Sequence, residues 1–202
     1  FIDASIAIKV AVNHGDGKNK LGAYHAHSKV FLDNSLLATL PAKELRVGMA
    51  ELVKISVVEE ERLFELLEMH GPALIETKFG QVNTEDSSYS AEQMKIIREA
   101  GEEVIYRGIH RMLEIESGNL KEYNLDRAIA FGHTWSPELE LIAKYTYGKL
   151  IMHGQAVAMD MALSMTLAQR RGLVSEEDRD RVHAVISSFG LMLDHPVQHD
   201  SD

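Results

Sequence analysis

The chain contains no cysteine among its 202 residues. This absence excludes disulfide bonds, thiolate metal ligands and a cysteine nucleophile, and it is consistent with a reducing cytoplasm. The sequence also lacks any apolar run near the ~20 residues that cross a bilayer, and it shows no recognisable signal peptide. We therefore expect a cytoplasmic protein that has no membrane partner.

Basic residues and nucleotide-binding motifs are also scarce. Lysine and arginine number 21 against 31 acidic residues, which gives a net charge of −10. This charge disfavours nucleic acid as a partner but permits a small anionic substrate, which needs only a local basic pocket. Neither GxGxxG nor GxxxxGK[ST] occurs, so these residues hold no dinucleotide fingerprint. The apolar content of 45% predicts an ordinary globular protein with a sizeable core.

Residues 1–40 differ in character from the rest of the chain. They contain two β-prone runs, Ile6–Val12 and Lys29–Leu32, which cannot form a stable sheet alone. We expect these runs to belong to a sheet completed by strands outside this sequence, and the chain, which starts at Phe1, to be part of a longer protein. The loop HGDGKNK between them suits phosphate binding, although a solvated hairpin loop explains the same composition.

Residues 41–202 predict a helical domain. Pro41 suits a first helical turn, and the apolar spacing predicts a first unit with a break near Val58–Glu61 and an end at Gly71. Residues 125–154 are expected to be mostly helical, with a break at Ser136–Pro137. Three further helices are predicted, over Ala91–Glu116 after a Ser90–Gln93 capping box, over a buried Gln155–Arg171, and from a Ser175–Asp178 cap to Gly190.

The strongest chemical signal is a possible metal site. His133 and His153 each adjoin a glycine, and Glu51 lies far upstream in GMAELVK. Two imidazoles and one carboxylate form the three-ligand, open-sided set of a catalytic zinc site, although ten histidines in the chain leave room for accidental pairs. Lys54 shares a helix face with Glu51, and its apolar surroundings favour an inward position over an exposed ion pair.

Five sequence blocks, in order, carry a resemblance that covers nearly the whole chain. The chain resembles the sugar phosphate cyclases, the family of 3-dehydroquinate synthase. This resemblance implies a mainly α chain, in which a short β-containing remnant of an N-terminal α/β NAD-binding domain precedes a multi-helical metal- and substrate-binding domain whose C-terminal end is missing. The blocks are DASIAIK (3–9), VNHGDGKNKLGAYH (12–25), LATLPAKELRVGMAELVKI (37–55), AFGHTWSP (130–137) and MHGQAVAMDMA (152–162).

The resemblance also implies cofactors, a partner and residue roles. We expect NAD, a Zn²⁺ or Co²⁺ ion, a small sugar phosphate substrate and a homodimer. The metal ligands would be Glu51, His133 and His153. The remaining roles would be catalytic for Asp3, Lys9, Lys54 and Glu122, substrate-binding for Asn19 and Lys18, and NAD-binding for Asp3, Lys18 and Thr39.

The implied reaction begins with hydride transfer from a substrate alcohol to NAD. A divalent ion lowers the pKa of that alcohol, oxidation acidifies the neighbouring C–H bond, and phosphate is eliminated. The hydride then returns, and the opened enol closes by an aldol step. Lys9 and Lys54 would stabilise the oxyanions that develop.

Four positions distinguish this chain from 3-dehydroquinate synthase. Met112 and Asp126 stand where that enzyme holds its substrate carboxylate with a lysine and an arginine. Ala130 and Pro137 replace an asparagine and a second histidine. A thioether and an acid cannot bind a carboxylate, so we expect these four residues to face an uncharged, hydroxyl-rich substrate group.

This pattern is similar to that of the 2-epi-5-epi-valiolone synthase branch, which cyclises sedoheptulose 7-phosphate. The alternatives within the family are a desmethyl-4-deoxygadusol synthase or 3-dehydroquinate synthase itself. Outside enzymes, the alternatives are a metal-binding helical module, a degenerate regulatory subunit or a purely structural domain. The intact ligand set argues against these non-enzyme alternatives.

Overall fold

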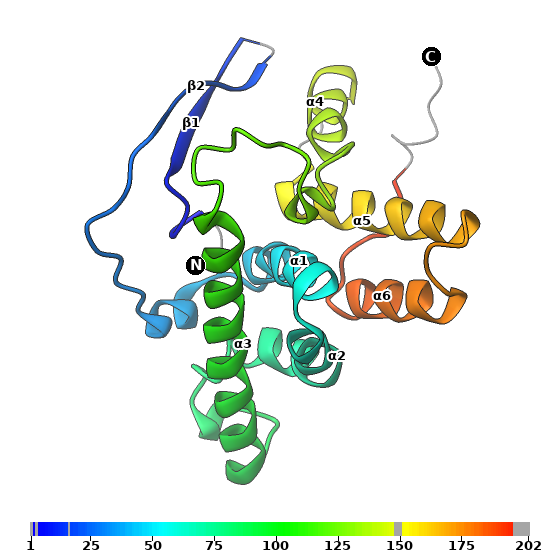
Figure 1. Cartoon of the computed structure of the whole chain (residues 1–202). Helices are drawn as coiled ribbons and strands as arrows, with labels where there is room; N and C mark the ends of the chain where they lie inside the picture. The colour runs from blue at the N-terminus through cyan, green and yellow to red at the C-terminus, as the bar shows by residue number, and fades with distance from the viewer. Residues whose placement is uncertain (1, 3, 16, 148–150, 196–202) are drawn as a thin grey trace.

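A computed structural model of the chain (Figure 1) describes residues 2, 4–15, 17–147 and 151–195. These residues form six α-helices, one β-hairpin and three short 3-10 helices, which confirms the predicted mainly α fold with a small β-containing segment. None of the helices in these ranges is long and apolar enough to cross a bilayer. The elements are β1 (Lys9–His14), β2 (Gly17–Tyr24), η1 (Asn34–Thr39), α1 (Ala42–Glu59), α2 (Glu61–Glu76), η2 (Thr84–Asp86), α3 (Ala91–Ser117), η3 (Ala128–Ala130), α4 (Ser136–Tyr147), α5 (His153–Arg170) and α6 (Glu176–Ser188).

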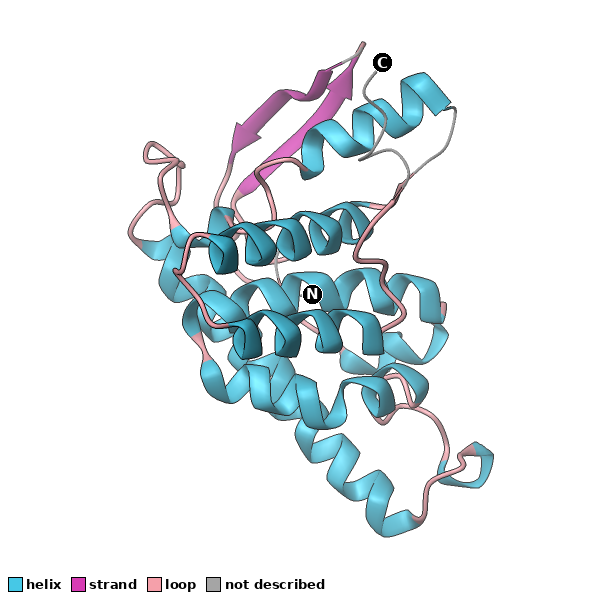
Figure 2. Ribbon diagram, turned by 90° about the vertical axis from the view of Figure 1, so that its right-hand side faces the viewer, coloured by secondary structure: helices cyan, strands magenta, loops and turns pink. Residues whose placement is uncertain are grey.

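The β-hairpin lies at one end of the helical body (Figure 2). Its strands pair antiparallel, with Lys9 opposite Tyr24, and their side chains are largely exposed. The predicted strand at Lys29–Leu32 is wrong, because this segment is a loop in which Phe31 is 88% exposed. Its β-prone side chains have no strand to pair with among the described residues, and strand preference depends on such a partner.

Helix α1 lies at the centre of the helical body (Figure 1), in contact with α2, α3, α5 and α6. Its apolar residues Leu45, Met49, Leu52 and Val53 are all buried, as their spacing predicts. The predicted break between the first two helices is confirmed, since α1 ends at Glu59 and α2 begins at Glu61. This central helix also carries Glu51, so the candidate site is built on the core of the domain.

The predicted end of the second helix at Gly71 is wrong. Helix α2 continues through Gly71 and Pro72 to Glu76. Leu67 and Leu74, which are both fully buried, keep one face of α2 against the core on either side of the proline. Tertiary packing therefore outweighs the low helix propensity of the Gly-Pro pair.

Two later helices begin where their capping boxes predict. The Ser90 and Gln93 side chains cap α3, and Ser175 and Asp178 cap α6 in the same reciprocal way. Each box satisfies two backbone N–H groups that have no partner within the helix. The predicted central helix from Gln155 is also confirmed, as α5.

Residues 125–154 are less helical than predicted. Up to Trp135 the stretch is mostly loop, with one short turn in η3, and Ser136–Pro137 begins α4 rather than breaking a helix. The first turn of a helix tolerates proline, because the missing N–H would have no partner there. The resulting loop carries His133, so this ligand lies on an irregular segment held between helices.

Candidate metal centre

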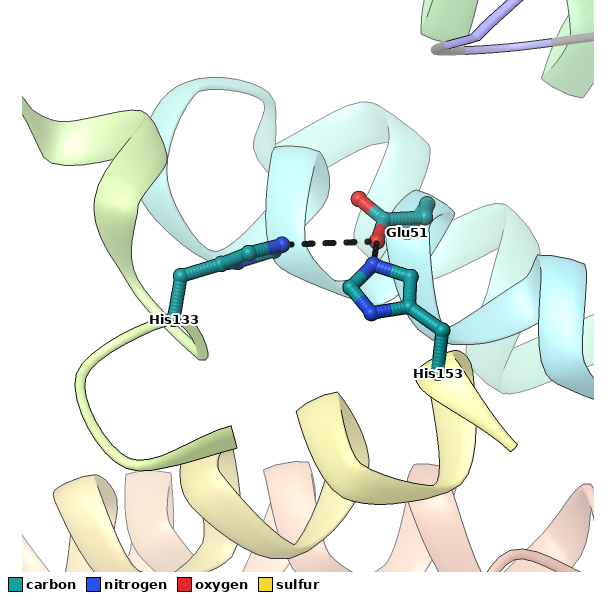
Figure 3. Close-up of side chains that lie close together, drawn as sticks. All are labelled: Glu51, His133 and His153. Carbon is teal, nitrogen blue, oxygen red and sulfur yellow. Dashed lines mark hydrogen bonds and ion pairs between the residues drawn. The ribbon is translucent and has the colours of Figure 1, made fainter. Parts of the chain in front are cut away.

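Three side chains from distant parts of the sequence meet at the predicted metal site (Figure 3). Glu51 comes from α1, His133 from the loop before α4, and His153 from the first turn of α5. One donor atom from each residue lies within 4.8 Å of the others. The Oε1 atom of Glu51 is 3.1 Å from Nε2 of His153 and 3.8 Å from Nε2 of His133.

Two glycines allow this convergence. A Cβ atom on Gly154 would lie 2.1 Å from the carbonyl oxygen of Val47, so only glycine lets the start of α5 approach α1 this closely. Gly132 has a left-handed backbone with φ of +76°, and a Cβ atom there would lie 2.8 Å from the side chain of Met161. Each histidine of the site therefore adjoins a glycine for a packing reason.

The electrostatics of the cluster suit a cation. Burial raises the pKa of Glu51, but the hydrogen bond with His153 and the charge of Lys54 outweigh it and hold that pKa well below its ordinary value. Burial and the nearby charge of Lys54 lower the pKa of His133. The site thus contains an ionised carboxylate and a neutral imidazole at neutral pH, the forms that bind divalent metals.

Hydrogen bonds orient both imidazoles. Nδ1 of His133 lies 3.3 Å from the carbonyl oxygen of Phe131, which can only accept, so Nδ1 carries the hydrogen and Nε2 offers its lone pair. The hydrogen bond to Glu140, followed by that to Glu51, raises the pKa of His153 to about 9. A cation at Nε2 would replace that proton. These three donors therefore fit a divalent metal in both type and arrangement.

Lys54 lies beside this cluster. Its Nζ atom is 2.5 Å from Oε2 of Glu51, and its side chain is only 3% exposed. The expected inward position of the Glu51–Lys54 pair is thus confirmed, and an exposed surface ion pair is excluded. A buried ammonium group next to a metal site can stabilise a developing oxyanion.

A second charged cluster lies around a cavity of about 260 Å³ next to His133. The Lys9 ammonium is 2.7 Å from Glu122 and 3.7 Å from Glu116, and Arg127 also pairs with Glu122. Burial raises the pKa of Glu122, but the hydrogen bonds from Lys9 and Arg127 outweigh it and lower that pKa. Glu122 has a left-handed backbone with φ of +52°, which is uncommon outside glycine.

The four predicted selectivity residues do not share one cavity. Met112 and Ala130 line the cavity of about 260 Å³, together with Lys54 and His133. Asp126 is exposed and does not line it, whereas its neighbour Arg127 does. Arg127 has an extended backbone, in which successive side chains point to opposite sides, and this explains why the acid faces away. Pro137 lies in the first turn of α4, outside this cavity.

A larger cavity of about 1,090 Å³ opens between the hairpin and α1. Asn19, Lys9 and Glu122 line it, and Glu51 and His153 reach it from the metal centre. Thr39 ends η1 and is exposed, and it lines neither of these two cavities. Asp3 and the side chain of Lys18 lie outside the described residues.

Four acidic or basic residues near the site escaped the sequence analysis. Arg127 and Glu116 line the smaller cavity, Glu140 contacts His153, and Asp160 is fully buried under the loop that follows His133. Asp160 had a detectable signal, because a single acid inside the apolar run 156–163 implies a buried partner. Glu140 meets His153 only through the packing of α4 on α5, for which the sequence carries no local signal.

Comparison with known proteins gives family matches along the whole chain. Residues 1–47 match the family model of the 3-dehydroquinate synthase N-terminal domain, and residues 48–202 match that of its C-terminal domain. Demethyl-4-deoxygadusol synthase of Trichormus variabilis is 52% identical over 98% of the chain, which covers 45% of that protein. The chain therefore spans slightly less than half of this relative.

Two solved structures are also similar. One is the 2-epi-5-epi-valiolone synthase ValA of Streptomyces hygroscopicus subsp. jinggangensis with NAD⁺ and Zn²⁺ bound, at 39% identity and a TM-score of 0.82 over 97% of this chain and 49% of that one. The other is a 2-deoxy-scyllo-inosose synthase with carbaglucose-6-phosphate, NAD⁺ and Co²⁺, at 25% identity and a TM-score of 0.67 over 98% of this chain and 49% of that one. On its sequence, fold and metal-ligand geometry, the chain belongs to the 3-dehydroquinate synthase family of sugar phosphate cyclases.

Proposed function

We propose that this chain forms the metal- and substrate-binding part of a sugar phosphate cyclase that converts sedoheptulose 7-phosphate into 2-epi-5-epi-valiolone and releases phosphate. The single observation that carries the proposal is the convergence of Glu51, His133 and His153 beside the buried Lys54. In this proposal the three converging residues hold Zn²⁺ or Co²⁺. When bound, the metal would supply a Lewis acid for a substrate alcohol, and NAD would supply a reversible hydride acceptor.

The cations of the chain have separate roles in this proposal. Lys54 is fixed next to the metal ligands and donates a hydrogen bond to the oxyanion that develops on the oxidised carbon. Lys9 lies in contact with Glu122 and lines both cavities, so it can bind a substrate hydroxyl there or pass a proton through Glu122. Asn19 lines the larger cavity, where we place the substrate phosphate with Lys18. Asp3, Lys18 and Thr39 are proposed NAD contacts.

The choice of an uncarboxylated substrate rests on charge balance in the smaller cavity. Its cations, Lys9, Lys54 and Arg127, each lie against a carboxylate within the protein. Met112 and Ala130 add apolar surface to the same cavity. A substrate carboxylate would have to compete with these internal ion pairs, whereas hydroxyl groups would hydrogen-bond to them. Asp126 and Pro137 stay proposed selectivity residues that would act from outside this cavity.

A demethyl-4-deoxygadusol synthase is the second candidate function. The 52% identity to the Trichormus variabilis enzyme favours it, since the identity to the valiolone synthase ValA is 39%. In the family patterns that the chain resembles, gadusol-type synthases carry an acid where Met112 stands and a small residue where Asp126 stands, so both residues favour the valiolone product. The expected homodimer and the cytoplasmic location stay predictions.

Substrate preference and product identity test this proposal. The full-length protein that contains this chain is incubated with NAD, Zn²⁺ or Co²⁺, and either sedoheptulose 7-phosphate or the carboxylated precursor of dehydroquinate. We expect phosphate release only with the heptulose phosphate, and a product with the mass and NMR spectrum of 2-epi-5-epi-valiolone. Turnover of only the carboxylated substrate would contradict the proposal, and a demethyl-4-deoxygadusol product would select the second candidate.

A further inference from the structure

Helices α4 and α5 meet through a small apolar cluster that is separate from the main core. Leu139 and Ala143 of α4 contact Ala156 and Met159 of α5 in this cluster. Such a small cluster fixes the spacing of two helices but specifies their rotation and axial position only weakly. Polar contacts on either side of the cluster provide the missing specificity.

The first polar contact fixes the start of α4. Asp160 of α5 is fully buried, and its Oδ2 atom accepts hydrogen bonds from the backbone N–H groups of Trp135 and Ser136, the latter at 2.8 Å. Its Oδ1 atom accepts a third, from the hydroxyl of Ser164, at 3.2 Å. A carboxylate at this position satisfies N–H groups that have no partner inside the helix and complements the helix dipole.

The second polar contact reaches the metal centre. Glu140 lies one helical turn after Ser136, and its Oε1 atom is 2.9 Å from Nδ1 of His153. His153 and Asp160 are seven residues apart on α5, which is two turns, so they present their side chains on the same face. The two contacts therefore fix α4 on α5 at positions that flank the apolar cluster along α5.

We infer that Glu140 is a positioning residue for His153, an inference that rests on the metal site of the proposed function. The carboxylate of Glu140 accepts the Nδ1–H hydrogen bond, which leaves Nε2 as the ligand atom directed at Glu51. A metal-bound histidine whose second nitrogen donates to a carboxylate is held in one tautomer and orientation and is a stronger ligand.

The contacts of the His153 ring on both sides, together with the low exposure of Glu140, support a positioning role over an accidental surface pair. The Glu140 side chain is 18% exposed and that of His153 is 43% exposed. The ring is hydrogen-bonded at both nitrogens, to Glu140 on one side and to Glu51 on the other. Rotation of the ring would break both contacts, so the ring orientation is set before any cation arrives.

Metal affinity and Co²⁺ spectroscopy on the full chain test the inference. The variants are Glu140→Ala, the isosteric Glu140→Gln, and Glu138→Gln as a control on the same helix with the same change in charge. Glu138 is exposed and shares the first turn of α4 with Pro137. Zn²⁺ affinity is measured by competition with a chromophoric chelator, and ligand geometry by the visible absorption of the Co²⁺ form.

We expect Glu140→Ala to weaken Zn²⁺ binding by about ten- to a hundredfold and to alter the Co²⁺ absorption bands. Glu140→Gln keeps an oxygen acceptor and should lose less, whereas Glu138→Gln should match the unsubstituted chain in both measurements. Circular dichroism of the metal-free proteins establishes folding, and Glu140→Gln decides the question if the alanine variant does not fold.

Three results would overturn the inference. The first is unchanged affinity and an unchanged Co²⁺ spectrum in folded Glu140 variants. The second is an equal loss in Glu138→Gln, which would make the effect one of general charge. The third is an unsubstituted chain that binds no metal, and this result alone would remove the proposed metal site together with the role of Glu140.

Discussion

Helix α1 carries one buried carboxylate, Glu51, and is followed directly by another, Glu60, and the two have opposite surroundings. Glu51 contacts two imidazoles and the Lys54 ammonium. Glu60 lies nine residues further along, about 13 Å by helical rise, and binds Arg107 at 2.6 Å and also Arg111. Guanidinium groups cannot release a proton in proteins, but imidazoles can. Burial of an acid alone therefore does not indicate a metal site. Contact with imidazoles does, because an imidazole can release its proton and bind a metal ion instead.

The largest expected effect separates these two acids by metal binding. Glu51→Gln removes one of three ligands and its charge, so we expect Zn²⁺ affinity to fall by about a thousandfold or more. Glu60→Gln is the matched control and should bind Zn²⁺ like the unsubstituted chain. Chelator competition measures both affinities. An equal loss of Zn²⁺ affinity in the two variants would show that Glu51 is not a specific metal ligand.

The next prediction distinguishes metal binding from catalysis at Lys54. Lys54→Met removes the buried ammonium without removing a ligand. We expect phosphate release by the full-length protein to fall by about a hundred- to a thousandfold, because oxyanion stabilisation is lost. Zn²⁺ affinity should not weaken, since a positive charge has left the site. If Lys54→Met instead kept its rate of phosphate release and bound Zn²⁺ more weakly, Lys54 would support metal binding and not oxyanion stabilisation.

The third expected effect is a loss of stability on substitution of Glu60. The hydrogen bond from Arg111, then the charges of both arginines, outweigh burial and lower the pKa of Glu60. Glu60→Gln should reduce the free energy of unfolding at pH 7 by about 1.5–3 kcal/mol, the usual value of a hydrogen bond to a charged group. Urea denaturation of both proteins measures the difference.

The pH dependence of that difference has a definite sign. Because the pKa of Glu60 is lower in the folded chain than in the unfolded one, the ionised form stabilises the fold above the unfolded value of about 4.3. The stability advantage over Glu60→Gln should therefore be complete at neutral pH and shrink as the pH falls below about 4.3 towards the lowered folded value. A difference that grows on acidification would contradict this assignment.

The smallest effect is expected at Arg62, which joins the Glu60–Arg107 pair through Glu103. Arg62 is 47% exposed and pairs with Glu65, which is equally exposed, and with Glu103. Exposed pairs of this kind contribute little, because water screens them and the side chains lose freedom. Arg62→Gln should leave the urea midpoint unchanged within error, and a loss as large as that of Glu60→Gln would show that the network acts as a unit.

The sequence predicted the metal ligands better than the substrate cavity. Glu51 and the two histidines were found because ligand chemistry and family motifs both constrain them. Helix starts with capping boxes, as at Ser90, were also predictable because the signal is local. Features that depend on tertiary packing were not predictable. Helix α2, for example, continues through Gly71 because its neighbouring residues are buried.

The separation of the proposed selectivity residues between the smaller cavity and its outside has a local cause. The sequence predicts a mostly helical stretch after Leu125, whereas the structure has a loop there up to η3. The extended backbone at Arg127 turns alternate side chains to opposite sides, so Arg127 faces the cavity and Asp126 does not. Neighbouring residues in this irregular segment thus present charges of opposite sign to the smaller cavity and to solvent.

Anomalous diffraction from crystals of the full-length protein soaked in Co²⁺ or Zn²⁺ tests the central claim most directly. We predict one strong peak about 2.0–2.2 Å from a carboxylate oxygen of Glu51 and from Nε2 of both His133 and His153. A peak that contacts only one of these residues, or that lies at Glu60 instead, would contradict the account.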